Sequence, residues 1–357
     1  MAKDRYALIM AGGRGTRFWP RSRKRNAKQV LRFFGERSLI QQAVDRLEGV
    51  VPPENIWVLT NDFLQDTIRK QLPKIPKKQI LAEPSQQNTA PCIALAAHIL
   101  TDLSPKSVMG VFPADHLILK EGRFRKYVKA AFQAAEKNNV VVLGIQPRWA
   151  ETGYGYIEFP QNVAPGSFET AAVSSFREKP DKKTANQFVK AGHFFWNAGM
   201  FFWKTSTVLE LMRHHQPKTA TLLASLPSFG SKKFTAKLQE VYPLCDNISI
   251  DYAVIEKAQN VAGIALDDIG WNDVGSWEAV YELTDKDENG NASKNEIIAE
   301  NSRGNYVSAE KPVALVGVEN LVVVDTPDAL LVANRTRSQD VSKIVKHLDA
   351  QKREELL

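Results

Sequence analysis

The sequence predicts an α/β protein, with a doubly wound, Rossmann-like sheet in a large N-terminal domain and a small C-terminal β domain. Short apolar or β-branched runs alternate with segments of helical periodicity as far as residue 144. This alternation is typical of a mainly parallel sheet covered by helices. The chain has 357 residues, of which 43% are hydrophobic, so it can bury one large core and a smaller one.

The expected elements follow one another in order. We expect strands at 6–10, 56–59, 79–82, 108–112 and 140–144, and helices at 38–47, 63–71, 89–102 and 124–138. Asn88 stands directly before the third helix and is a credible cap, because its side chain can accept hydrogen bonds from the first turn. Ligands of such sheets bind beyond the carboxyl ends of the strands. The loops that follow the strands are therefore where we expect the site.

The sequence changes character at residue 285, where a polar, turn-forming run begins. We expect a large domain over 1–284, a small β domain over 285–337 and a helix over 338–357. The strands expected in the small domain lie at 304–308, 313–318, 321–325 and 329–332. One face of the helix is apolar and must cover a surface, for which a partner subunit is one candidate.

Residues 285–296 also match the spacing of a calcium-binding EF-hand loop. An EF-hand needs a helix on both sides of this loop. The sequence after Ile297 soon reads as strand, so we reject a calcium site.

The composition of the sequence indicates the cellular compartment in which we expect the protein. No apolar run approaches the roughly 20 residues that cross a bilayer, and no signal-like segment precedes the first strand. We therefore expect a cytoplasmic protein without a membrane partner. The two cysteines, Cys92 and Cys245, lie in apolar surroundings, which argues against a disulfide framework and against a cysteine metal site.

Residues 11–17, Ala-Gly-Gly-Arg-Gly-Thr-Arg, directly follow the first strand and form the most informative motif. Three glycines within four positions let backbone N–H groups approach an anion, because no Cβ stands in the way. The loop lacks the Gly-Lys-Ser/Thr ending of a P-loop, and Phe18 stands where a dinucleotide-binding fold has its third glycine. A polyphosphate site of another kind is the interpretation we favour, with a plain tight turn as the alternative.

Positive charge is concentrated around this loop. The formal net charge is +7, and eight of the basic residues, including Arg14, Arg17 and Lys28, lie between positions 14 and 32. Such a cluster attracts anions. Nucleic acid would fit the charge, but no nucleic-acid-binding motif follows. We therefore expect small phosphorylated ligands and no nucleic acid.

Further polar motifs lie at strand ends or in loops downstream. Asp115 follows the strand at 108–112 and is well placed to hold a hard divalent cation, beside a histidine that local hydrogen bonds would orient. Glu178 and Lys179 could meet sugar hydroxyls and phosphate, or simply decorate the surface. Asn197 lies in an apolar stretch, where an amide needs partners, and Asp273 lies between glycines and aromatic residues. The glycine-rich run at 153–158 is either a site loop or the start of a strand.

Taken together and in order, these motifs resemble the sugar-1-phosphate nucleotidyltransferase family, and within it the bacterial mannose-1-phosphate guanylyltransferase branch, over nearly the whole chain. The resemblance implies that the glycine loop, Arg17 and Lys28 hold a triphosphate, and that Asp115 and Asp273 bind magnesium. Lys179 would lie beside the phosphate of the sugar 1-phosphate, which is the attacking group. The remaining substrate-binding residues that it implies are Ala11, Gly12, Gly13, Gly15, Thr16, Glu83, Asn88, Thr89, Ala90, Gly153, Glu178 and Asn197.

The resemblance also implies a fold and a reaction. The fold would be the mixed sheet of the nucleotidyltransferases with a short left-handed β-helix that helps to form a homodimer. The reaction would be attack of mannose 1-phosphate on the α-phosphorus of GTP, which gives GDP-mannose and pyrophosphate. The sequence departs from the branch at Ala27, where proline is usual, and at Gln86 and Gln87, where Gly-Arg is common. Transfer of another nucleotide to glucose 1-phosphate and a non-catalytic nucleotide-binding regulator are the alternatives.

Overall fold

The computed structural model describes residues 4–137 and 140–357, so the expected end of a helix at Asn138 lies outside them. Ten strands form the main sheet: β1 (Arg5–Met10), β2 (Ile56–Thr60), β3 (Ile80–Ala82), β4 (Val108–Pro113), β5 (Val140–Ile145), β6 (Tyr156–Glu158), β7 (Ala171–Ala172), β8 (Ser175–Arg177), β9 (Phe194–Lys204) and β10 (Val261–Leu266). The α-helices of this part are α1 (Leu39–Asp45), α2 (Asp62–Gln71), α3 (Thr89–Leu103), α4 (Glu121–Ala135), α5 (Lys182–Ala191), α6 (Thr205–His215), α7 (Pro217–Ala224), α8 (Phe234–Val241) and α9 (Trp277–Leu283). Within the described residues, no helix has the length and apolar character needed to cross a membrane.

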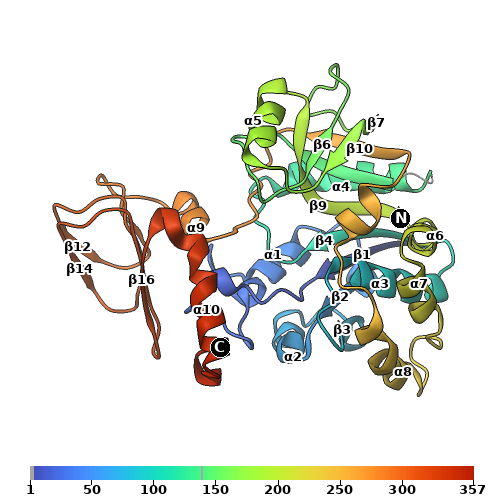
Figure 1. The fold of residues 1–357 in the computed structure, drawn as a ribbon, viewed down its shortest axis with the longest axis horizontal. Helices are drawn as coiled ribbons and strands as arrows, with labels where there is room; N and C mark the ends of the chain where they lie inside the picture. The colour runs from blue at the N-terminus through green and yellow to red at the C-terminus, as the bar shows by residue number, and fades with distance from the viewer. Residues whose placement is uncertain (1–3, 138–139) are drawn as a thin grey trace.

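The sheet is mixed, with the order β3-β2-β1-β4-β9-β5-β10-β7, and β6 and β8 branch from β9 (Figure 1). Strands β1 to β4 run parallel to one another, and so do β5 and β10. The long strand β9 lies antiparallel between β4 and β5. The five strands expected from the sequence are confirmed. The sequence reasoning missed β9, which occupies the centre of the sheet.

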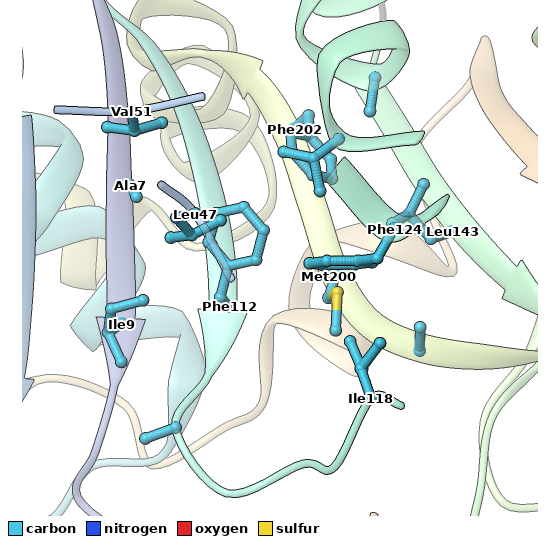
Figure 2. Close-up of a cluster of buried hydrophobic side chains, with 14 of the residues drawn as sticks. Ala7, Ile9, Leu47, Val51, Phe112, Ile118, Phe124, Leu143, Met200 and Phe202 are labelled. Carbon is cyan, nitrogen blue, oxygen red and sulfur yellow. The ribbon is translucent and has the colours of Figure 1, made fainter. Parts of the chain in front are cut away.

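Side chains on both faces of β1 are buried in the core. Ala7 and Ile9 point into one cluster with Phe112 and Phe202, as Figure 2 shows, whereas Leu8 packs into a second cluster that includes much of α3. Burial on both faces is what keeps a strand in the middle of an α/β sheet. The loop that follows β1 therefore starts from a rigid position.

The C-terminal part forms a β-helix-like stack. Its strands are β11 (Ala292–Ser293), β12 (Ile297–Glu300), β13 (Tyr306–Ser308), β14 (Val313–Val316), β15 (Leu321–Asp325) and β16 (Leu330–Asn334). The chain alternates between two sheets, so that β11, β13 and β15 pair in parallel in one and β12 and β14 in the other. Strands rather than a helix follow the loop at 285–296, and this confirms that it is not an EF-hand.

The last helix, α10 (Val341–Ala350), lies between the β-helix-like part and the N-terminal segment (Figure 1). Its buried residues Val341 and Val345 share a core with Phe18 and Trp19. The apolar face that was expected to cover a surface, with a partner subunit as one candidate, thus packs largely against the helix's own chain. Only Ile344, 41% exposed, remains as a large apolar side chain open to solvent on this helix.

Candidate active site

The glycine loop after β1 presents its N–H groups and hides its carbonyls. The buried amide of Gln29 donates to the carbonyls of Ala11 (2.7 Å) and Gly13 (2.9 Å), and Ser22 donates to that of Gly15 (2.7 Å). Among the described residues, no acceptor meets the N–H groups of Gly12, Gly13, Arg14 and Gly15. An array of free N–H groups with its carbonyls tied back is suited to an anion.

Gly15 is required by the shape of this loop. Its φ is +63°, in the region that favours glycine, and a Cβ there would lie 2.6 Å from the Cβ of Lys28. This close approach brings the short helical turn Lys28–Val30 against the loop. The same turn supplies Lys28 to the site and Gln29 to the loop carbonyls.

Lys28 joins the two expected metal ligands. Its Nζ donates to Oδ2 of Asp115 at 2.8 Å and to the backbone carbonyl of Asp273 at 2.6 Å. The two aspartate segments are held together by a pair of backbone hydrogen bonds between Leu117 and Asn272. Lys28 and this backbone pair therefore join two segments that lie far apart in the sequence, each with one of the expected aspartates, beyond the carboxyl end of β4.

The segment around Asp273 is locally strained. Val274 is buried with φ +47°, which is an unfavourable conformation for a β-branched residue, and its N–H donates to the Asn272 side chain at 2.7 Å. Tyr154 donates its hydroxyl to Oδ1 of Asp273 at 2.6 Å. The strain and the hydrogen bonds together fix the direction of one carboxylate.

Electrostatics keep Asp115 ionised and its neighbour neutral. Burial by itself would raise the pKa of Asp115, but the charge of Lys28 and its hydrogen bond to this carboxylate outweigh burial, so the pKa lies below its ordinary value. Burial lowers the pKa of His116 to about 4. The Nδ1 of His116 accepts from the Trp271 indole at 3.2 Å. This is the locally oriented histidine expected from the sequence.

A second polar group lies near the beginning of β9, around Asn197. Asn197 donates to Oδ1 of Asp251 at 2.9 Å, and Lys179 donates to the buried carboxylate of Glu178 at 2.6 Å. Burial and the charge of Glu178 raise the pKa of Asp251 to about 6. A Cβ on Gly155 would come within 2.4 Å of Glu178, so this glycine is required for the close packing.

Three expected residues turn out to have structural partners. The N–H of Gly153 donates to its neighbour Glu151, and Gly153 is exposed, so Gly155 is the glycine that lines this group. Ala90 is fully buried, and its N–H donates to the Ile248 carbonyl. The Asn88 side chain caps α3 by accepting from Thr89 at 2.9 Å, as expected.

A pocket of about 630 Å³ lies beside the glycine loop and extends to Asp115 and Asp251. Its lining does not include Lys28, Asp273, Glu178 or Asn197. Its lining includes the expected residues Ala11, Gly12, Gly13, Glu83, Asn88, Thr89 and Asp115, together with Gln29 and Asp251. The sequence reasoning assigned no role to Gln29 or Asp251. Neither residue lies in the glycine loop or directly after an expected strand, so neither carried a signal of its own.

Glu83 lies beside Gly12 at the edge of this pocket. It accepts a hydrogen bond from the Tyr242 hydroxyl, and burial raises its pKa to about 7. A Cβ on Gly12 would lie 3.3 Å from Glu83. The carboxyl group thus faces the loop in a form that takes up a proton near neutral pH.

The basic cluster is partly neutralised within the chain. Arg14, Lys24 and Arg23 form ion pairs with acids of the C-terminal part, and Lys28 pairs with Asp115. Arg17 is exposed and donates a long hydrogen bond of 3.5 Å to the Gly275 carbonyl. The high local charge expected to serve ligands alone therefore also ties the glycine loop to the C-terminal part.

The donor set suits a cation that shares its ligands with substrate phosphates. Within the described residues, no group of three or more His, Cys, Asp or Glu side chains could enclose a metal ion. Asp115 and Asp273 provide two carboxylates, and Mg²⁺ is commonly held by one or two carboxylates plus phosphates. The residues present therefore fit a divalent cation that arrives with a nucleotide.

The fold and site define a nucleotidyltransferase. The chain matches the model of the family described as nucleotidyl transferase over residues 6–290, and that of the MannoseP isomerase/GMP-like beta-helix domain over residues 295–348. It therefore belongs to the nucleotidyl transferase family.

Its relatives confirm the expected branch. The chain is 38% identical over 353 residues to a mannose-1-phosphate guanylyltransferase of Klebsiella pneumoniae, with 98% of this chain and 74% of the relative covered. It is 37% identical over 356 residues to the alginate biosynthesis protein AlgA of Pseudomonas putida, with 98% and 72% covered. A crystal structure from Thermus thermophilus, described as a mannose-1-phosphate geranyltransferase, has a TM-score of 0.85 and 32% identity over 97% of this chain and 99% of that one.

Proposed function

We propose that the protein transfers GMP from GTP to mannose 1-phosphate and releases GDP-mannose and pyrophosphate. The observation that carries the proposal is the position of Lys28, which joins two aspartates beside a loop of free N–H groups. The names of the relatives supply the substrates, and family membership supplies the class of reaction. No protein nucleophile is required, because the sugar phosphate is itself the nucleophile.

In this proposal the chain acts by positioning and charge. The N–H groups of Gly12 and Gly13 hold the triphosphate, and Arg17 and Lys28 neutralise the departing pyrophosphate. Asp115 and Asp273 hold Mg²⁺, which when bound supplies positive charge to the phosphates of both substrates. These groups bring two polyanions together, which is the main obstacle to the reaction.

The group near β9 would receive the sugar. Glu178 and Asn197 offer an acceptor and an amide to hydroxyl groups, and Lys179 offers charge to the attacking phosphate. The Lys179 side chain is 53% exposed, so it is accessible to a ligand from solvent. Thr16, Thr89 and Ala90 remain proposed neighbours of the nucleotide.

The test is a matrix of substrates. The protein with Mg²⁺ is incubated with each nucleoside triphosphate and each of mannose 1-phosphate and glucose 1-phosphate, and pyrophosphate release is measured. We expect the fastest release with GTP and mannose 1-phosphate. A faster reaction with glucose 1-phosphate and another nucleotide would replace this assignment by the related activity, and silence in every pair would favour a nucleotide-binding regulator.

We further propose a cytoplasmic homodimer that associates through the C-terminal part. Ile298, Val316, Leu330 and Val332 of the β-helix-like strands are each more than half exposed, which supports a contact surface there. Light scattering after size exclusion tests this, because a mass of one chain at micromolar concentration would contradict it. We also propose the domain limits 1–284 and 285–337, with 338–357 as a helical end.

A further inference from the structure

Two basic side chains on the outer side of the glycine loop, Arg14 and Lys24, form ion pairs with acidic residues of α10 and of the segment that follows it. Nη1 of Arg14 lies 3.3 Å from Oδ2 of Asp349. Nζ of Lys24 lies 2.6 Å from Oε2 of Glu354 and 3.9 Å from Oδ1 of Asp349. The reaction as proposed above uses none of these four side chains.

The two cations lie next to the nucleotide pocket. Arg14 and Lys24 line a hollow of about 330 Å³ together with Gly12 and Glu83. Gly12 and Glu83 also line the larger pocket, so the two hollows adjoin at the glycine loop. An anion held by the N–H groups of Gly12 and Gly13 would be within the reach of a long basic side chain on the neighbouring residue.

The ion pairs that hold these cations are of the exposed kind. The side-chain exposures are 38% and 39% for Arg14 and Asp349, and 25% and 69% for Lys24 and Glu354. Exposed pairs contribute little and are screened by salt. The Lys28 side chain, by contrast, is 8% exposed and makes a second hydrogen bond to a carbonyl. A polyanion would therefore displace the outer acids more readily than it would displace Asp115.

The loop keeps its shape without these pairs. Its carbonyls are tied to Gln29 and Ser22, which lie within the N-terminal segment. The main-chain oxygens at the chain end also accept hydrogen bonds from the N-terminal segment. The Trp19 indole donates to the Leu356 carbonyl (3.0 Å), and the Lys24 backbone N–H donates to the Leu357 carbonyl (2.7 Å). The side-chain pairs can therefore exchange partners while the two segments stay together.

We propose that Arg14 and Lys24 are two further ligands of the triphosphate, and that Asp349 and Glu354 hold them until the nucleotide arrives. This inference rests on the proposed function. The acids compete with phosphate for the same two cations, so they lower the affinity for GTP. They also keep the loop from binding unrelated small anions strongly.

The test uses the full chain and direct binding of GTP by calorimetry, without sugar phosphate. The double variant Asp349→Asn/Glu354→Gln is expected to bind GTP about two- to tenfold more tightly than wild type at low salt, as expected for the loss of two exposed pairs. The gain should vanish at high salt. Asp340→Asn is the matched control, because Asp340 lies at the start of the same helix and pairs with Arg337 and Lys343 instead.

A second pair of variants tests whether Arg14 and Lys24 themselves bind the nucleotide. Arg14→Gln/Lys24→Gln should bind GTP less tightly than wild type, and adding the two acid substitutions should then change nothing. Equal or weaker binding by the acid double variant would overturn the inference, since it would mean that the acids brace the loop. A gain equal to that of Asp340→Asn would also overturn it. Absence of GTP binding by wild type would contradict the proposed function instead, so the two failures are distinguishable.

Discussion

The carboxylate of Asp273 offers the sharpest test of the site. Asp273→Asn removes one negative charge and keeps the shape of the side chain. The oxygen of the new amide can still accept from Tyr154, and Lys28 donates to the backbone carbonyl of residue 273, which the substitution leaves in place. We therefore expect the free energy of unfolding to change by less than about 1 kcal/mol.

The effect on turnover should be far larger. Loss of one well-placed group that stabilises transition-state charge costs about 2–4 kcal/mol, or about 10²–10³ in rate. Pyrophosphate release at saturating substrates measures turnover, and thermal unfolding checks the fold. Tyr154→Phe is the matched control, because it removes the hydrogen bond and keeps the charge, so its loss should be at most about tenfold. A near-normal rate for Asp273→Asn with an intact fold would refute the assignment of this residue as a metal ligand.

The remaining predictions concern the loop, a buried acid and the cation. Gly15→Ala should destabilise the protein by about 1–3 kcal/mol, because its Cβ would lie 2.6 Å from Lys28, whereas Gly13→Ala meets nothing within 4 Å; denaturant unfolding of both tests this, and equal losses would contradict it. The pKa of Glu83 is about 7 in the folded protein, against an ordinary value of 4.5. The unfolded chain therefore releases this proton at a lower pH than the folded protein does, and the free energy of unfolding falls as pH rises through this range. Wild type should therefore lose on the order of 1–3 kcal/mol more stability than Glu83→Gln between pH 5 and 8, and parallel curves would contradict this. Chelation should abolish pyrophosphate release and added Mg²⁺ should restore it; turnover that survives chelation would exclude a metal requirement.

The sequence predicted the elements whose signals are local. The strands β1 to β5 are buried apolar runs bounded by polar turns, and the cap at Asn88 is a single side chain next to its helix. Asp115 could be placed at the carboxyl ends of the strands because it comes shortly after the end of β4. The glycine loop could be identified because three glycines within four positions are themselves the feature that lets backbone N–H groups approach an anion.

What the sequence did not predict depends on long-range pairing. Strand β9 contains an internal Asn and Gly, and its place between β4 and β5 is set by antiparallel partners far along the chain. Asp251 owes its raised pKa to burial and to Glu178, neither of which is visible in its own segment. The ion pairs of Arg14 and Lys24 join the first loop to the end of the chain, so charge counting alone treated them as free.

The contacts of Lys28 have a consequence for the order in which the protein folds. They span 87 residues to Asp115 and 245 residues to Asp273. Closing such large loops is entropically costly, and contacts of high sequence separation are slow to form. Strands β1 to β4 can pair with one another before the chain beyond residue 270 returns to them. We therefore expect recovery of activity during refolding to lag behind recovery of secondary structure, with the catalytic site among the last parts of the molecule to assemble.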